Sequence, residues 1–256
     1  MSLEFLISKI QKNNFLLIGR AGVDIYPDPP GTKTENANTY VTHLGGSSAN
    51  MGVQLVKYGG SCSLLTRVSN DALGKFALNQ LDHYGVNRDL VKLEDNESRI
   101  SFAIVETTIE DHQSIIYRHK AADLFLNKSD IENAKIHNYE CILITGTSLA
   151  AQPSRDAVLY ALKLAKEHNI PVIMDIDYRP YTWESAEKAK DVYNLACDYC
   201  SGVIGNDDEF AILSGNYDEG LNYAKKLSSK CDLVIFKMGE KGSITFSQNS
   251  KIIKGI

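Results

Sequence analysis

The sequence predicts an α/β fold, in which a mainly parallel sheet lies between layers of helices and a smaller sheet projects from it. Short apolar runs such as "CILITGT" and "DLVIFKMG" alternate with longer segments of helical character. Buried strands that alternate with amphipathic helices are typical of parallel sheets with helices on both faces. Two extended segments, at roughly 25–44 and 98–120, break the alternation and predict the smaller sheet. We expect residues 1–256 to form one domain.

The strands and helices of the main sheet follow one another along the chain. The strands are the apolar runs at 14–19, 61–68, 141–147, 170–177, 202–206 and 232–239. The helices include "PSRDAVLYALKLAKEHN", in which apolar residues recur three and four positions apart. They are expected after Ser47 and at 71–86, 153–169, 184–198, 207–213 and 217–229.

The two extended segments have patterns of their own. Residues 25–44 are Pro-rich and then extended, whereas "SRISFAIVETTIEDHQSIIYRH" alternates like a β-hairpin with a polar turn near residues 110–113. A small sheet that projects from an α/β domain commonly covers a ligand, so we expect a lid. Because projecting sheets have unpaired edges, we also expect a homodimer through the lid sheet.

Composition and charge limit the classes of binding partner and the cellular compartment that we expect. The formal net charge of -5 gives no reason to expect nucleic acid or an anionic membrane, because both select basic surfaces. No apolar run reaches the roughly 20 residues that span a bilayer, and the N-terminus lacks the signals of a secretory leader. We therefore expect a cytoplasmic protein with reduced cysteines in or near the core. The pair Cys197 and Cys200 lacks the further ligands of a zinc site.

The segment "HLGGSSANMGVQLVKYGG" is the most conspicuous loop of the sequence. It resembles a phosphate-binding loop at first sight, but a Walker loop requires a lysine that does not follow Gly52. The dinucleotide fingerprint also fails, because Gly45 and Gly46 are adjacent. What remains is a tight glycine turn that allows a ligand to approach the backbone closely.

Polar residues around this turn suit a sugar hydroxyl better than a phosphate. Ser47 or Ser48 is the expected N-cap of the following helix, and Asn50 in its first turn offers amide donors and an acceptor. Asp24 follows the first strand, at the edge where open α/β sheets bind ligands, and a carboxylate can accept bonds from two hydroxyls. An ordinary capped strand-to-helix turn is the alternative from the loop alone.

Five motifs in order resemble the signatures of the ribokinase-like, or PfkB, carbohydrate kinases. "IGRAGVDIYP" precedes the glycine loop, and "RVSNDALGKF" matches the family's G-x-D-x-x-G with Asp71 and Gly74. "DIDYRPYTW" resembles D-x-N-x-R-x-x-x-W, with Asp177 where Asn is usual, and "NDDE" matches N-x-x-E. The resemblance covers essentially the whole chain and implies a ribokinase-like three-layer α/β/α sandwich with a β-lid. Within the family, "GVDIYPDP" and "YRHKAADLFL" are most similar to the 5-dehydro-2-deoxygluconokinases of inositol catabolism.

The resemblance implies ATP-dependent phosphorylation of a sugar or sugar-acid hydroxyl, and the subfamily likeness favours 5-dehydro-2-deoxygluconate. Carried over by position, the residues that hold the sugar are Asp24, Gly45, Gly46 and Asn50. Arg118 and Arg179 are the candidates for an acidic or keto end of the substrate, because an arginine fork matches a carboxylate. A surface charge is the alternative for either arginine.

The resemblance also implies which residues bind the nucleotide. They are Asn206, Glu209, Lys237 and Gly239. Glu209 would act on Mg²⁺ largely through water, since this ion keeps several water ligands. The alternative for Asn206 and Glu209 is an ordinary helix start, where acidic residues are favoured. The alternative for Lys237 and Gly239 is a plain strand and turn.

The family's catalytic base is an aspartate in a G-A-G-D segment, which the sequence does not contain. We expect this base beyond Ile256 and therefore a chain that lacks the C-terminal part of the fold. A catalytically inactive sugar-binding family member is the alternative. Within the family, kinases for 2-keto-3-deoxygluconate, fructose, ribose or a nucleoside share the same scaffold, and the sequence leaves these substrates open.

Overall fold

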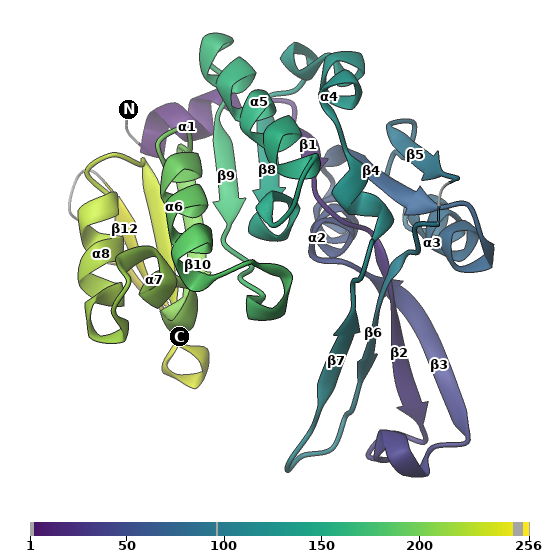
Figure 1. Cartoon of the computed structure of the whole chain (residues 1–256). Coiled ribbons are helices and arrows are strands. Elements are labelled where there is room, and N and C mark those ends of the chain that lie inside the picture. The colour runs from purple at the N-terminus through teal and green to yellow at the C-terminus, as the bar shows by residue number, and fades with distance from the viewer. Residues whose placement is uncertain (1–2, 96, 248–252, 256) are drawn as a thin grey trace.

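The computed structural model describes residues 3–95, 97–247 and 253–255 and shows a large sheet flanked by helices, with a second sheet projecting from it (Figure 1). The large sheet has nine strands in the order β13-β12-β11-β10-β9-β8-β1-β4-β5. Its strands are β1 (Asn14–Ile18), β4 (Ser61–Ser69), β5 (Val91–Glu94), β8 (Cys141–Thr145), β9 (Val172–Asp175), β10 (Gly202–Asn206), β11 (Leu233–Lys237), β12 (Ser243–Ser247) and β13 (Ile253–Gly255). Neighbouring strands from β11 to β5 pair in parallel, and β12 and β13 add an antiparallel edge.

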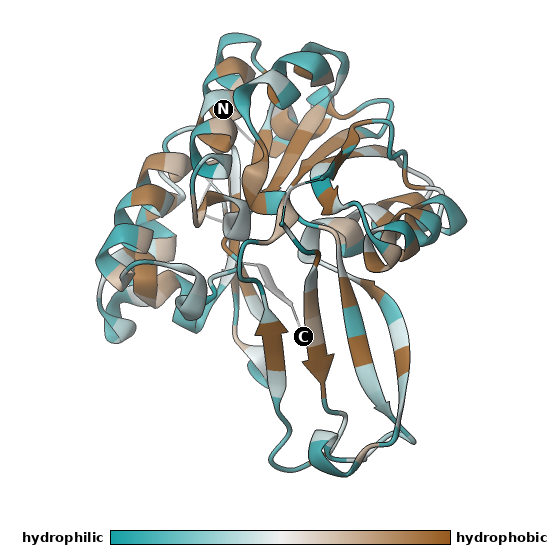
Figure 2. Ribbon diagram, turned by 45° about the vertical axis from the view of Figure 1, so that its right-hand side comes forward, coloured by the Kyte–Doolittle hydropathy of each residue, from teal (hydrophilic) through white to brown (hydrophobic). Residues whose placement is uncertain are grey.

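The helices cover both faces of this sheet. They are α1 (Leu3–Lys9), α2 (Ser47–Lys57), α3 (Ala72–His83), α4 (Lys128–Ala134), α5 (Ser154–Glu167), α6 (Ala186–Cys197), α7 (Asp207–Ser214) and α8 (Gly220–Leu227). Alternation along β1 divides the core, because Leu16 and Ile18 belong to one buried cluster and Leu17 to another. The apolar strands between the two helix layers are visible in Figure 2. The predicted α/β class therefore follows from strands that are buried on both faces.

Five elements were not predicted from the sequence: α1, α4, β5, β12 and β13. Each is short, with at most seven residues. In α4, Asn127 and Asp130 form a reciprocal capping box, in which each side chain accepts from the other residue's backbone N–H. Such local capping defines a helix that hydrophobic periodicity is too short to reveal.

The projecting sheet is built from the two predicted extended segments. It contains β2 (Gly22–Asp28), β3 (Thr39–Gly45), β6 (Ser101–Val105) and β7 (Ser114–Tyr117) in the order β3-β2-β6-β7. The hairpins β2–β3 and β6–β7 are antiparallel, and β2 pairs with β6 in parallel. Both hairpins extend away from the main sheet (Figures 1 and 2). We call these four strands the lid sheet.

Glu106 joins the two hairpins at the outer end of the lid sheet. The residue is 6% exposed, and its Oε1 accepts from the backbone N–H of Thr34 at 2.8 Å. The Oε2 accepts from the backbone N–H of Gln113 at 3.0 Å and lies 3.4 Å from Lys33 Nζ. The hydrogen bond from Thr34 is the main reason that the pKa of Glu106 is lowered to about 2.

The pKa of Glu106 predicts a pH-dependent contribution to stability. Because the pKa is depressed in the folded state, the stabilisation is complete above the ordinary value of 4.5 and is lost as pH falls toward about 2. We expect Glu106→Gln to lower the melting temperature at pH 7, and the difference from wild type to shrink below about pH 4.5. Scanning calorimetry at several pH values measures it, with exposed Glu110→Gln as the control. A difference that does not change with pH would contradict the assignment.

Candidate functional site

The predicted sugar-site residues gather where the lid sheet joins the carboxyl ends of the main strands. Asp24 lies in β2 opposite His43 of β3, and the turn at Gly45 and Gly46 follows directly. A Cβ at position 45 would lie 2.2 Å from Asp24 Oδ1, so only glycine leaves room for that carboxylate. Gly46 has a φ of +94° and a Cβ there would lie 2.5 Å from Arg20 O. The two glycines therefore allow the turn to approach both Asp24 and the backbone of Arg20, which follows β1.

The predicted serine cap of α2 is wrong. Gly46 is the N-cap and makes no side-chain capping bond, so the helix begins at Ser47. Both serine hydroxyls have other partners: Ser47 Oγ donates to Asp177 Oδ2 at 2.6 Å, and Ser48 Oγ lies 3.0 Å from Thr145 Oγ1. Tertiary hydrogen bonds thus replace local capping. Asn50 lies in the first turn, as predicted, and its side chain is exposed.

Asp177 connects the glycine turn to the loops after β8 and β9. Its Oδ2 accepts from Ser47 and, at 3.2 Å, from Thr147 Oγ1, while its Oδ1 lies 2.7 Å from Arg179 Nη2. The residue is 4% exposed and has a φ of +39°, a conformation that Asp and Asn adopt more readily than most residues. Asp177 therefore fixes the direction of Arg179.

Arg118 reaches the same network from the lid. Its Nη1 donates to Thr147 O at 3.1 Å, and its Nη2 forms an ion pair with Asp123, in which both side chains are buried. Thr147 thus bonds to Arg118 through its carbonyl and to Asp177 through its hydroxyl. The structure brings together both arginines that the sequence nominated.

A third guanidinium, that of Arg20, lies beside these two and was not nominated from the sequence. Arg20 follows β1, is 8% exposed, and interacts electrostatically with both Arg118 and Arg179. The motif "IGRAGVDIYP" contains this residue, but no periodic or spacing signal distinguishes it from a solvated charge at a strand end. Next to the network, a cleft of about 390 Å³ is lined by Arg118 and Tyr181 among others.

The surroundings of Asp24 change the pKa of its carboxyl group. Burial is the main cause that raises the pKa of Asp24 above its ordinary value, and the charges of Arg20 and His43 oppose the rise. The half-buried carboxylate can therefore accept hydroxyl donors near neutral pH and loses its charge at a higher pH than an exposed aspartate.

The predicted nucleotide residues lie at the carboxyl ends of β10 and β11. Asn206 and Glu209 form a reciprocal capping box at the start of α7, with both bonds at 2.8 Å. Glu209 Oε1 also accepts from the backbone N–H of Tyr178 at 3.2 Å. Both oxygens of Glu209 accept backbone N–H groups. In this structure Glu209 therefore joins the loop after β9 to α7.

Lys237 and Asp175 face each other at the ends of β11 and β9, with Lys237 Nζ 3.6 Å from Asp175 Oδ1. This oxygen is buried and accepts no hydrogen bond from the described residues, and burial is the main cause that raises the pKa of Asp175. Gly239 is exposed, with a φ of +56° at the turn after β11. The ammonium, the glycine turn and the start of α7 thus form an open polar edge.

No cluster of three or more His, Cys, Asp or Glu residues in the described part of the chain has the geometry of a metal site. The residues do fit a magnesium ion held mainly by phosphates and water, because this ion commonly uses only one or two carboxylates.

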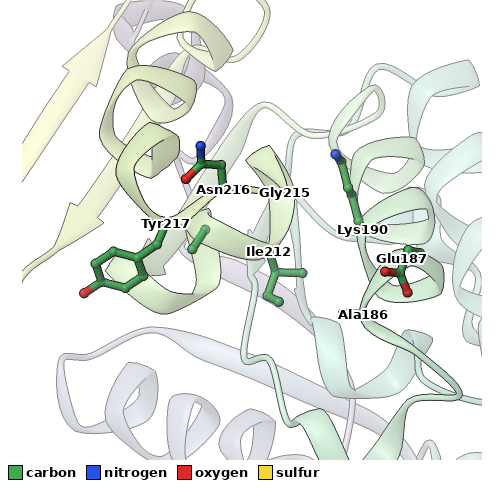
Figure 3. A pocket seen from close by; sticks show the side chains of 8 residues that line it. Ala186, Glu187, Lys190, Ile212, Gly215, Asn216 and Tyr217 are labelled. Carbon is green, nitrogen blue, oxygen red and sulfur yellow. The ribbon is translucent and has the colours of Figure 1, made fainter.

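A separate pocket of about 390 Å³ lies between α6 and α7, lined by Lys190, Ile212, Asn216 and their neighbours (Figure 3). It shares no residue with the site described above.

All five cysteines are buried and unpaired. Within the described ranges, none of the helices combines the length and hydropathy needed to cross a membrane.

Comparison with known proteins identifies consistent relatives. The model of the family described as pfkB family carbohydrate kinase matches residues 12–254. A 5-dehydro-2-deoxygluconokinase of Photobacterium profundum is 34% identical over 247 residues, covering 94% of this chain and 75% of that protein. The enzyme of the same name from Bacillus subtilis is 30% identical over 246 residues, with the same two coverages.

Solved structures share the fold. A fructokinase double mutant of Vibrio cholerae, solved with fructose, ADP and potassium ion, has a TM-score of 0.82 and 25% identity over 96% of this chain and 77% of its own. A PfkB protein of Polaromonas sp. JS666 has a TM-score of 0.82 at 19% identity, covering 95% and 83%. The predicted ribokinase-like α/β fold is thereby confirmed.

The Asp177 network predicts a loss of stability when its carboxylate is removed. Asp177→Ala leaves Ser47, Thr147 and Arg179 without their acceptor, so we expect the free energy of unfolding to fall by about 2 kcal/mol. Urea denaturation measures it. The matched control is Asp198→Ala, which breaks an exposed ion pair with Lys230 and is expected to change stability by less than about 1 kcal/mol. Equal effects of the two substitutions would show that the network is not stabilising.

Proposed function

Because the chain belongs to the pfkB family of carbohydrate kinases, we propose that its site binds 5-dehydro-2-deoxygluconate and ATP and phosphorylates a hydroxyl of this sugar acid. The family transfers a phosphoryl group to a sugar hydroxyl, and this protein is a kinase of that class. Relatives of 30–34% identity that carry the name 5-dehydro-2-deoxygluconokinase support the choice of substrate. A role in inositol catabolism follows from the same substrate.

One observation carries this choice within the family. Arg118 and Arg179, from the lid and from the loop after β9, are joined through Thr147 and Asp177 at the base of the lid. Two guanidiniums that converge on one edge of a sugar site favour a substrate with a carboxylate, since the arginine fork matches carboxylate geometry. A neutral sugar such as fructose offers neither guanidinium a carboxylate to bind.

The sugar hydroxyls would be held on the other side of the site. Asp24 accepts from hydroxyl groups, Asn50 in the first turn of α2 can donate and accept, and Gly45 and Gly46 let the sugar approach the backbone. The lid sheet, which carries Asp24 and ends near Arg118, would exclude water when the sugar is bound.

ATP would lie along the polar edge formed by Asn206, Glu209, Lys237 and Gly239. The ammonium of Lys237 would neutralise phosphate charge, and Glu209 would act on a magnesium ion through water, as its occupied oxygens require. When bound, magnesium supplies charge neutralisation to the transferred phosphoryl group. The chain covers 75% of the length of the Photobacterium profundum relative, and we assign the general base to none of its 256 residues.

A second copy of this chain is the partner that we propose for the lid sheet. Tyr40, Val41, Ile115 and Tyr117 of this sheet are each at least 41% exposed, and the outer strands have free edges among the described residues. We expect a dimer in sedimentation velocity at micromolar concentration, and Val41→Glu to shift it toward monomer. A monomer for the wild-type chain would exclude this arrangement.

The substrate assignment predicts that Asp24→Ala weakens binding of 5-dehydro-2-deoxygluconate by roughly 10- to 100-fold, because a charged hydrogen bond is lost. Isothermal titration measures the affinity, and a coupled ADP-release assay measures turnover. Asp111→Ala, at an aspartate whose side chain is 89% exposed, is the control and should bind as wild type.

The outcomes separate the candidate functions. Binding together with turnover supports the kinase assignment, whereas sugar binding with no turnover in this chain and in a chain of the relatives' full length would favour an inactive sugar-binding protein. Full affinity in Asp24→Ala would refute the placement of the sugar.

A further inference from the structure

Arg20 is the unusual member of the three guanidiniums at the base of the lid. It follows β1 and is 8% exposed, and its side chain donates from Nη1 to Ser101 Oγ at 3.1 Å. Arg118 is paired with Asp123 and Arg179 with Asp177, but no carboxylate of the described residues lies within ion-pair distance of Arg20. The Nε atoms of all three arginines are buried without a partner among these residues, so the missing carboxylate is what distinguishes Arg20.

An unpaired guanidinium in this position is costly for the fold. Burial lowers the pKa of Arg20, the charges of Arg118 and Arg179 lower it further, and those of Asp177 and Asp123 oppose them. An arginine nevertheless stays protonated in proteins. The folded chain thus retains a positive charge that is desolvated and lies beside two others. Such an arrangement is typical of sites where function opposes stability.

Arg20 also lies between the two halves of the proposed sugar site. Its charge acts on Asp24, the proposed hydroxyl acceptor, and on Tyr181, whose side chain lines the cleft with Arg118. Its Nη1 is fixed by Ser101 at the start of β6, so the guanidinium is held in one direction and still has N–H donors to offer.

We propose that Arg20 binds the carboxylate of the sugar acid and determines the preference of this site for acidic over neutral sugars. The inference rests on the proposed function, because it concerns the same site. The ligand's carboxylate supplies the ion-pair partner that the described residues do not provide, and it can do so while the hydroxyls bond to Asp24. Arg118 and Arg179, whose charges are already compensated, then orient the same end of the ligand.

The alternative is that Arg20 only ties β1 to the lid through Ser101. Two properties distinguish the roles. A structural tie requires that Arg20→Gln lower the melting temperature, and that Ser101→Ala, which removes the bond and keeps the charge, reproduce its effect on the sugar. A ligand-binding role requires that Arg20→Gln lose the acid preference while it still binds the neutral analogue, and that Ser101→Ala keep the acid preference.

The experiment is isothermal titration of the 256-residue chain with two ligands. One is 5-dehydro-2-deoxygluconate, and the other is its neutral analogue, in which a primary alcohol replaces the carboxylate. We expect the wild type to bind the acid more tightly, and Arg20→Gln to reduce the acid-to-neutral affinity ratio by about 10- to 100-fold while neutral binding stays within about threefold. Arg99→Gln, which removes an exposed arginine and the same net charge, should leave the ratio unchanged.

Each result decides one claim. If wild type prefers the acid and Arg20→Gln keeps that preference, the role of Arg20 is overturned and the proposed function stands. If wild type binds neither ligand, the proposed function fails and the role of Arg20 fails with it. If Arg20→Gln does not fold, the tie through Ser101 is favoured, and Arg20→Lys decides. A retained part of the acid preference then supports the charge role, and its complete loss excludes it.

Discussion

The Asp177 carboxylate is the interaction on which the rest of the site depends. It accepts from Ser47 at the start of α2, from Thr147 after β8 and from Arg179 after β9. These partners come from three separate crossovers of the sheet, so their loops cannot be placed independently. The glycine turn before Ser47 then fixes Asp24, and the carbonyl of Thr147 fixes Arg118. One buried carboxylate thus relates the hydroxyl side of the site to its cationic side.

Two of the three arginines of the site have a carboxylate partner within the described residues, and the third has none. Arg118 and Arg179 have carboxylate partners within the chain, whereas Arg20 has none among the described residues. On the nucleotide side, Asp175 Oδ1 is buried beside Lys237 and accepts no hydrogen bond from the residues that the structure describes. The first place carries a charge without an ion-pair partner, and the second carries a buried acceptor oxygen without a hydrogen bond, both at edges where we propose that ligands bind. Groups of this kind are expected where binding energy matters more than the stability of the free chain.

Much of the fold and part of the site could be predicted from the sequence, for identifiable reasons. Continuous apolar runs predicted the buried strands, and the turn at Gly45 and Gly46 was predicted to lie near Asp24, which the structure explains because only glycine leaves room for that carboxylate. The serine cap was wrong because the tertiary partners of Ser47 and Ser48 lie 130 and 97 residues away along the chain. Arg20 was missed because its burial beside Arg118 arises only when β1 and the lid meet.

The central claim is that one end of this site binds hydroxyls and the other binds a carboxylate. A crystal structure of the chain with 5-dehydro-2-deoxygluconate tests it most directly. The account predicts sugar hydroxyls within hydrogen-bond distance of Asp24, and the carboxylate within hydrogen-bond distance of Arg20 and of at least one of Arg118 and Arg179. A ligand bound with its carboxylate toward Lys237, or bound elsewhere on the molecule, would contradict it.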